Sequence, residues 1–279
     1  MGKTHQELLG DHPCLPNQFG KWLVCNDVAR TATKCHRSLT ANDSTSADEM
    51  IDWLASKLIH HHYSDYRLRK LKEKFSQLGF PKYAEQHRKL PRVDKVKKGN
   101  ATEILLTEYV EGCLNKPLVK AFKLKYNPNV DQAIKGDDTL MVEIIRTSDE
   151  EKVKIYLGEA KFRKKPSKNV VETICLSLGK EKFPISYSFL VEELAKDAST
   201  EELADILDNH FIDEIKGKGD LIYTGFLLSN SETHDVVEKH LGSDNPTFIL
   251  VSVGLENPED LINKAFEKAE ELLSKPLAL

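Results

Sequence analysis

An acid and a base stand close together at the end of one strand-like segment of the sequence. The segment runs from Val153 to Lys161, and Glu159 lies just before its end. Because side chains alternate between the two faces of a strand, Glu159 and Lys161 share the face that carries the preceding odd-numbered, apolar residues. Burying such charges costs free energy unless they are paired or bind an ion. We therefore predict that this end of the strand is a functional site or is exposed to solvent.

A second strand-like segment begins with another acid, Asp138. If Arg146 pairs with Val153 across the intervening turn, Asp138 lies opposite Lys161 and diagonal to Glu159 on the same face. Diagonal neighbours have backbones about 7–8 Å apart, which places the two carboxylates within reach of one shared ion. The sequence therefore predicts that acids from two neighbouring strands meet.

This pairing leaves the identity of the second acid open. In the register just given, the adjacent Asp137 points to the opposite face of the strand. A shift of one residue would exchange the faces of Asp137 and Asp138, because the side-chain period of a strand is two residues. Either aspartate can supply the carboxylate until the register is known.

A third acid comes from a helix that precedes the two strands. Apolar residues recur along residues 101–114 with the spacing of a helix that buries one stripe. On a projection with about 100° per residue, Glu103 falls at the edge of this stripe, so we expect it to point towards the sheet. The alternative is purely structural, because Asn100 and Glu103 have the spacing of a capping box. Beside the strand pattern, we favour a role in the site.

Carboxylates on neighbouring strands with a lysine beside them have a specific chemical use. Two carboxylates and a carbonyl oxygen can hold Mg²⁺ while leaving positions for a water molecule and a phosphate oxygen. The metal neutralises charge in the transition state and acidifies the water, and the lysine orients this nucleophile and stabilises the developing charge. The pattern therefore predicts hydrolysis of a phosphodiester.

The elements around these residues indicate an α/β fold with a mixed central β-sheet flanked by helices. From residue 99 onwards the predicted order is a helix, three strands, a helix, one or two acidic helices, and then strand, helix, strand and helix. The predicted strands cover residues 119–126, 138–146, 152–162, 221–228 and 248–253. Before residue 99 we expect a mainly helical region, with helices over residues 49–61 and 63–78.

The composition sets the class of protein. Of the 279 residues, 40% are hydrophobic and 30% are charged, which excludes collagen-like, low-complexity and wholly disordered proteins. No stretch approaches the ~20 consecutive apolar residues of a membrane-spanning helix, and the first residues contain no apolar signal segment. The five cysteines are an odd number without close pairing, which favours free thiols in a reducing compartment. We therefore expect a globular, cytoplasmic protein with no membrane partner.

The net charge of −4 hides an uneven distribution. Residues 67–98 carry twelve Lys and Arg against three acids, whereas residues 192–279 carry twenty acids against seven lysines. The basic segment could neutralise phosphates, and the acidic segment could contact a protein partner, although solvated helix surfaces are the simpler interpretation of both. Four further cations follow the predicted site and could hold the backbone of DNA or lie in a solvated loop: Arg163, Lys164, Lys165 and Lys168.

Several segments of the sequence resemble a known group of nucleases. GDD at residues 136–138 and GEAK at residues 158–161, with the upstream helical glutamate, are similar to the PD-(D/E)xK nuclease superfamily. More closely, GNATEILLTEYVE, FKLKYNPNVDQAIKGDDTLMVE and YLGEAKF resemble the HamA family, the nuclease subunits of Hachiman anti-phage systems in bacteria. The chain departs from the superfamily motif where Asp137 replaces the proline before the motif aspartate.

The resemblance implies a role for individual residues and for whole regions. It assigns the motif residues to Asp138, Glu159 and Lys161, the helical acid to Glu103, and a metal-binding carbonyl to Ala160. It implies a restriction-endonuclease-like core over residues 99–279 and an N-terminal helical, basic region over residues 1–98 for partner contact or regulation.

The same resemblance implies DNA as substrate, Mg²⁺ as cofactor with Mn²⁺ able to replace it, and a helicase partner, HamB. The opposing interpretation is a catalytically inactive nuclease-fold protein that serves as a DNA- or partner-binding regulatory subunit. The complete set of motif residues argues against that interpretation, since an inactive copy has no chemical reason to keep them on one face.

Overall fold

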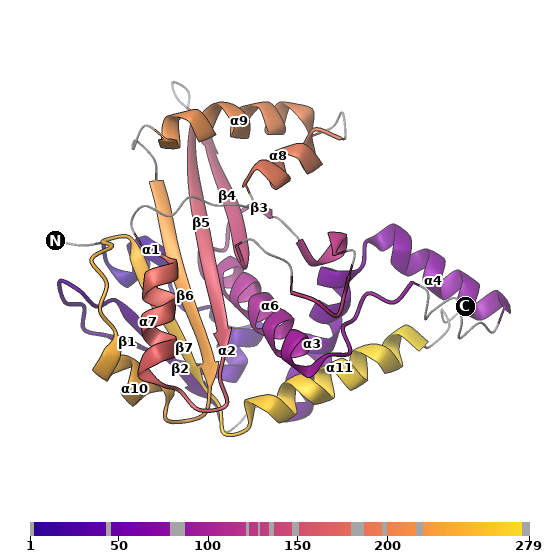
Figure 1. Ribbon diagram of the computed structural model, residues 1–279, viewed down its shortest axis with the longest axis horizontal. Coiled ribbons are helices and arrows are strands. Elements are labelled where there is room, and N and C mark those ends of the chain that lie inside the picture. Colours follow the sequence, from indigo (N-terminus) through magenta and orange to yellow (C-terminus); the bar gives the residue numbers. More distant parts are fainter. Residues whose placement is uncertain are drawn as a thin grey trace.

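A computed structural model describes residues 3–42, 46–78, 87–120, 123–127, 129–133, 137–146, 151–179, 187–196, 200–215 and 220–274. Within these residues the chain forms a mixed sheet of seven strands in the order β1-β2-β7-β6-β5-β4-β3 (Figure 1). The strands are β1 Leu23–Val28, β2 His36–Ala41, β3 Val119–Lys120, β4 Thr139–Arg146, β5 Glu151–Phe162, β6 Asp220–Ser229 and β7 Phe248–Gly254. Pairing is parallel from β2 through β7 and β6 to β5, and antiparallel in the pairs β1–β2, β5–β4 and β4–β3. The predicted mixed α/β sheet is confirmed.

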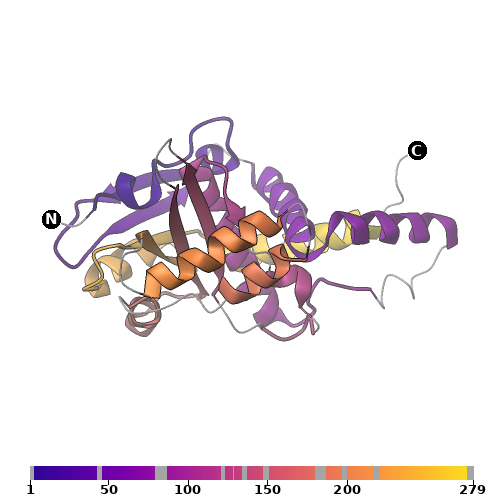
Figure 2. The same ribbon diagram turned by 90° about the horizontal axis from the view of Figure 1, so that it is seen from above.

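Helices cover both faces of this sheet, as Figure 1 shows. They are α1 His5–Leu9, α2 Gln18–Trp22, α3 Ala47–His62, α4 Asp65–Leu78, α6 Asp94–Leu114, η1 Lys123–Tyr126 (a 3₁₀ helix), α7 Lys168–Ser177, α8 Tyr187–Leu194, α9 Glu201–Ile215, α10 Thr233–His240 and α11 Pro258–Ser274. One apolar cluster joins α3, α6 and α11 to the sheet, and a second joins α7, α8, α9 and α10 to it. Figures 1 and 2 both show α4 and the end of α11 extending away from the sheet. Among the described helices, none combines the length and the apolar character that a bilayer-spanning segment needs.

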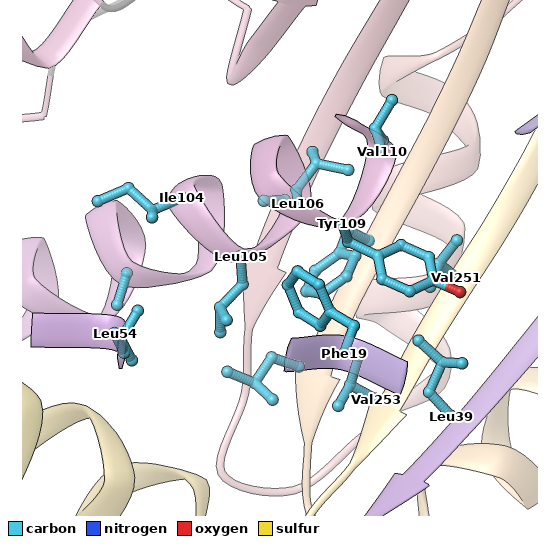
Figure 3. Close-up of a cluster of buried hydrophobic side chains, with 14 of the residues drawn as sticks. Phe19, Leu39, Leu54, Ile104, Leu105, Leu106, Tyr109, Val110, Val251 and Val253 are labelled. Carbon is cyan, nitrogen blue, oxygen red and sulfur yellow. The ribbon is translucent and has the colours of Figure 1, made fainter. Parts of the chain in front are cut away.

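The first cluster is built around α6, which runs across the sheet (Figure 3). Leu105, Leu106 and Tyr109 of this helix are at most 1% exposed. Phe19 packs edge-on against Tyr109, with ring centroids 5.2 Å apart and an interplanar angle of 86°. Full burial of each such side chain contributes about 1.5–3 kcal/mol. The position of α6 relative to the sheet is therefore fixed. This also fixes the position of any polar side chain that α6 carries at the edge of the apolar cluster.

The N-terminal region contributes two strands that the sequence analysis does not predict. β1 and β2 join the sheet because β2 pairs in parallel with β7. In β2, Arg37 is only 1% exposed. Its guanidinium donates to the carboxylate of Asp27 at 2.6 and 2.8 Å and to the carbonyl of Gly10 at 3.0 Å. A buried arginine breaks the apolar–polar alternation that marks a strand in sequence. The predicted boundary between residues 98 and 99 falls inside α6.

Candidate active site

The predicted pairing of the two site strands is wrong by two residues. Arg146 of β4 pairs with Glu151 of β5 rather than with Val153, and Thr139 pairs with Gly158. The segment between the strands is therefore shorter than predicted. An even shift leaves each side chain on its predicted face of the strand, so the acids still meet, although the residues directly opposite one another change.

Asp138 is held against β5 at the point where β4 begins. Its backbone N–H donates to the carbonyl of Gly158 at 3.2 Å, and its Oδ2 accepts a hydrogen bond from the backbone N–H of Ala160 at 2.8 Å. Asp138 lines the cleft described below. Asp137 is only 2% exposed and lies outside the lining of that cleft. The structure thus places Asp138, rather than Asp137, in the candidate site.

Glu103 reaches the same cleft from α6. The helix begins at Asp94, with Val93 as its N-cap residue, so Asn100 lies inside the helix. The capping-box alternative for Glu103 is therefore excluded. Burial raises the pKa of Glu103 to about 8, and the neighbouring charge of Asp138 adds to this increase. A carboxyl group with such a pKa holds its proton at neutral pH.

A lysine that the sequence analysis does not identify lies between these two acids. The Nζ of Lys123 is 3.1 Å from Glu103 Oε2 and 3.1 Å from Asp138 Oδ1. Burial alone would lower the pKa of Lys123, but the two carboxyl groups raise it above its usual value. The Lys123 side chain is therefore a charged group in a mostly buried position.

The strand predicted over residues 119–126 is wrong, and this error hides Lys123. β3 covers only Val119–Lys120, and Lys123 begins the 3₁₀ helix η1. Alternating apolar and basic residues predict a strand whose lysines point to solvent. No spacing in the sequence distinguishes Lys123 from Lys125, so the contact with Glu103 becomes visible only in three dimensions.

Glu159 and Lys161 emerge together at the end of β5. The Nζ of Lys161 donates a hydrogen bond to Glu159 Oε1. The Glu159 side chain is 13% exposed and that of Lys161 is 27% exposed, so both are mostly buried yet reach solvent. This is the position that strand alternation predicts for them, at the boundary between an apolar strand face and water.

One cleft of about 850 Å³ brings these groups together. Its lining includes every residue that the sequence analysis assigns to catalysis or to the metal: Glu103, Asp138, Glu159, Ala160 and Lys161. Of the four predicted DNA-binding cations, Arg163 and Lys164 line the cleft, whereas Lys165 and Lys168 are exposed outside its lining. The cleft therefore combines an acidic interior with cations beside it.

The oxygen atoms of these residues fit the coordination of a hard divalent cation. Within the described part of the chain, no three His, Cys, Asp or Glu side chains are already arranged as ligands around one point. Lysines contact the acids instead: Lys123 lies between Glu103 and Asp138, and Lys161 contacts Glu159. Carboxylate and carbonyl oxygens are the ligands that Mg²⁺ takes. The carboxylates that now contact ammonium groups can therefore hold such an ion.

Gly158 allows α6 and β5 to approach closely beside the site. A Cβ atom at this position would lie 2.7 Å from Leu106 Cδ2 and 3.1 Å from the Cβ of Thr139. We predict that Gly158→Ala lowers the free energy of unfolding by about 1–3 kcal/mol, because the fully buried Leu106 must shift to accommodate the new methyl group. Urea unfolding checks this value. Gly99→Ala is the matched control, since nothing lies within 4 Å of its added methyl group and alanine favours a helix; equal losses in both variants would contradict the steric explanation.

Fold and cleft together define a class: an α/β protein whose mixed sheet and longest helix present carboxylates and lysines to one cleft. The sequence model of the HamA family matches residues 17–269. The chain is also 34% identical, over 271 residues and 96% of each chain, to the Hachiman protein HamA of Bacillus cereus. The chain therefore belongs to the HamA family. This result confirms the resemblance to that family and supports a role in anti-phage defence.

Proposed function

We propose that this chain is a Mg²⁺-dependent DNA nuclease of the PD-(D/E)xK type, the effector of a Hachiman-type anti-phage complex. The observation that carries the proposal is the convergence of Glu103, Asp138, Glu159 and Lys161 in one cleft. These four residues come from a helix and two neighbouring strands. They are also the positions to which the superfamily resemblance assigns catalysis.

The residues of the cleft divide the chemistry between them. Asp138, Glu159 and the carbonyl of Ala160 would hold the metal ion, which neutralises charge on the phosphate and acidifies water. Lys161 orients the attacking water and stabilises the charge that develops on the phosphate. Its contact with Glu159 keeps the ammonium group at the end of β5. Lys123 holds Glu103 beside Asp138 and so sets the position of both acids.

The surroundings of the cleft support nucleic acid as the substrate. Arg163 and Lys164 line the cleft directly after β5, and Lys165 and Lys168 lie exposed in the following residues. Contacts of this kind to backbone phosphates position DNA without reading its sequence. The Hachiman context further suggests partner subunits, and we propose that a HamB-like helicase restrains the nuclease until DNA is sensed, with residues 1–98 contributing to that contact.

Cleavage assays with the purified chain test the proposal. We expect supercoiled, linear or single-stranded DNA to be degraded in Mg²⁺ and in Mn²⁺, and to remain intact in EDTA, because the chain itself supplies only the ligands and the lysine. The same assays are repeated with the helicase subunit added. Intact DNA under all of these conditions would favour the inactive, regulatory subunit.

A further inference from the structure

A carboxylate bridges two lysines at one side of the candidate active site. Glu259, in the first turn of α11, contacts Lys98 of α6 through Oε1 at 2.6 Å and Lys164 through Oε2 at 3.0 Å. All three residues line the cleft that also contains Glu103 and Asp138. The two lysines come from separate elements of the fold, so Glu259 is the group that joins them.

Lys98 is held in place by further contacts. Its Nζ lies 2.6 Å from Asp94 Oδ2 and 5.5 Å from the centroid of the Phe162 ring, and its side chain is only 17% exposed. Hydrogen bonds from Lys98 and then from Lys164 lower the pKa of Glu259, so this carboxyl group is an anion at neutral pH. The arrangement is therefore an anion between two ammonium groups, one of which is fixed in advance.

We propose that Lys98 and Lys164 form a binding position for a backbone phosphate of DNA, and that Glu259 occupies this position in the free protein. The inference rests on the proposed function, because it names the residues that hold the substrate beside the candidate active site. Carboxylate and phosphate oxygens accept hydrogen bonds from the same charged donors. DNA would therefore displace the Glu259 carboxylate, which acts as an internal competitor.

The position of Lys98 suits this role. Lys98 precedes Glu103 by five residues in α6, which corresponds to about 7.5 Å along the helix axis. One strand of duplex DNA carries a charge about every 3.4 Å of its axis. A strand that reaches the acids of the site can therefore place a second phosphate near Lys98.

A structural ion pair is the competing interpretation of Glu259. It would tie α11 to α6 and contribute to stability, and partly exposed ion pairs of this kind contribute about 0–1 kcal/mol. The two interpretations differ in one measurable quantity. A tie between helices affects unfolding, whereas an internal competitor weakens the affinity for DNA.

The test is the affinity for a short fluorescein-labelled duplex, measured by fluorescence anisotropy in EDTA so that no cleavage occurs. We expect Glu259→Gln to bind about three- to fivefold more tightly than the parent. Asp260→Asn is the matched control, because it removes the same charge one residue away, where the carboxylate pairs with Lys264 at 2.8 Å. We expect this control to bind like the parent. Lys98→Met and Lys164→Met should each weaken binding and reduce the slope of log affinity against log salt by about 1.

Each outcome decides the proposal. The triple variant Lys98→Met/Lys164→Met/Glu259→Gln should gain nothing over Lys98→Met/Lys164→Met, because Glu259 contacts both lysines and the competitor then has no binding position to block. Equal affinities of Glu259→Gln and Asp260→Asn would overturn the inference, and so would a gain that persists without both lysines. Thermal unfolding of every variant verifies that the fold is intact.

The same set of proteins separates this inference from the nuclease proposal. If Glu259→Gln binds more tightly but the parent cleaves no DNA with Mg²⁺, the phosphate position stands and the nuclease proposal fails. If the parent cleaves DNA and Glu259→Gln shows no gain in affinity, the nuclease proposal stands and the phosphate position fails.

Discussion

Glu159→Gln and Lys161→Met are each expected to slow Mg²⁺-dependent DNA cleavage by ~10²–10³-fold, the effect of losing one group that stabilises charge in the transition state. Glu159→Gln keeps the size of the side chain but removes one negative charge, so the proposed metal ion would lose a carboxylate ligand. Lys161→Met keeps most of the side-chain length and removes the ammonium group at the end of β5. The measurement is the initial rate of plasmid cleavage at saturating Mg²⁺.

An ion pair outside the lining of the cleft provides the control for these two variants. Asp260 and Lys264 form an i,i+4 pair at 2.8 Å in α11, with both side chains about half exposed. Asp260→Asn and Lys264→Met make the same changes in charge, and we expect both to cleave like the parent. Parental rates in Glu159→Gln and Lys161→Met would show that the cleft is not where hydrolysis occurs.

Glu103→Gln is expected to remove the loss of stability that the Glu103 carboxyl group causes as pH rises in EDTA. The pKa of Glu103 is about 8 in the folded protein and 4.5 for an ordinary glutamate. A carboxyl group that binds its proton more tightly when folded lowers the free energy of unfolding as pH rises, here between about pH 4.5 and pH 8. At about 1.4 kcal/mol for each unit of pKa, the loss across this window is roughly 3–5 kcal/mol.

Glutamine imitates the protonated form of Glu103, so the variant and the parent should be equally stable near pH 5 and should diverge at alkaline pH. Urea unfolding at about pH 5 and about pH 8.5 measures this difference. Glu111→Gln is the control on the same helix, because Glu111 is partly exposed and pairs with Lys120 at 2.6 Å. A parental pH dependence in Glu103→Gln would mean that the carboxyl group is not the source of the loss.

The sequence predicts the part of the site that depends on local geometry. Strand alternation alone places Glu159 and Lys161 together, because the side-chain period of a strand is fixed by the backbone. It also tolerates the error in register, since the true pairing of Arg146 with Glu151 differs from the predicted one by an even number of residues. An odd error would have moved Asp138 to the wrong face.

Interactions between distant segments could not be predicted in the same way. Lys123 is charged and flanked by apolar residues, which in sequence is typical of an exposed strand, and only its two carboxyl partners explain its burial. β2 escapes prediction for a related reason, because Arg37 is buried by Asp27 from the neighbouring strand and by Gly10. In both cases the groups that stabilise the buried charge come from other elements of the fold. The periodicity of one segment gives no information about such partners.

The pairing of β2 with β7 limits how far the protein can be shortened. A truncation at residue 99 would remove β1 and β2, together with the first turn of α6, which begins at Asp94. β7 would then stand at the border of the sheet with unpaired backbone N–H and C=O groups, and its side chains from Phe248 to Val253 are almost fully buried in the intact protein. Such a border recruits strands from other molecules. The residues of the candidate site lie in the second part of the chain, but we expect the first part to be needed to keep that sheet from self-association.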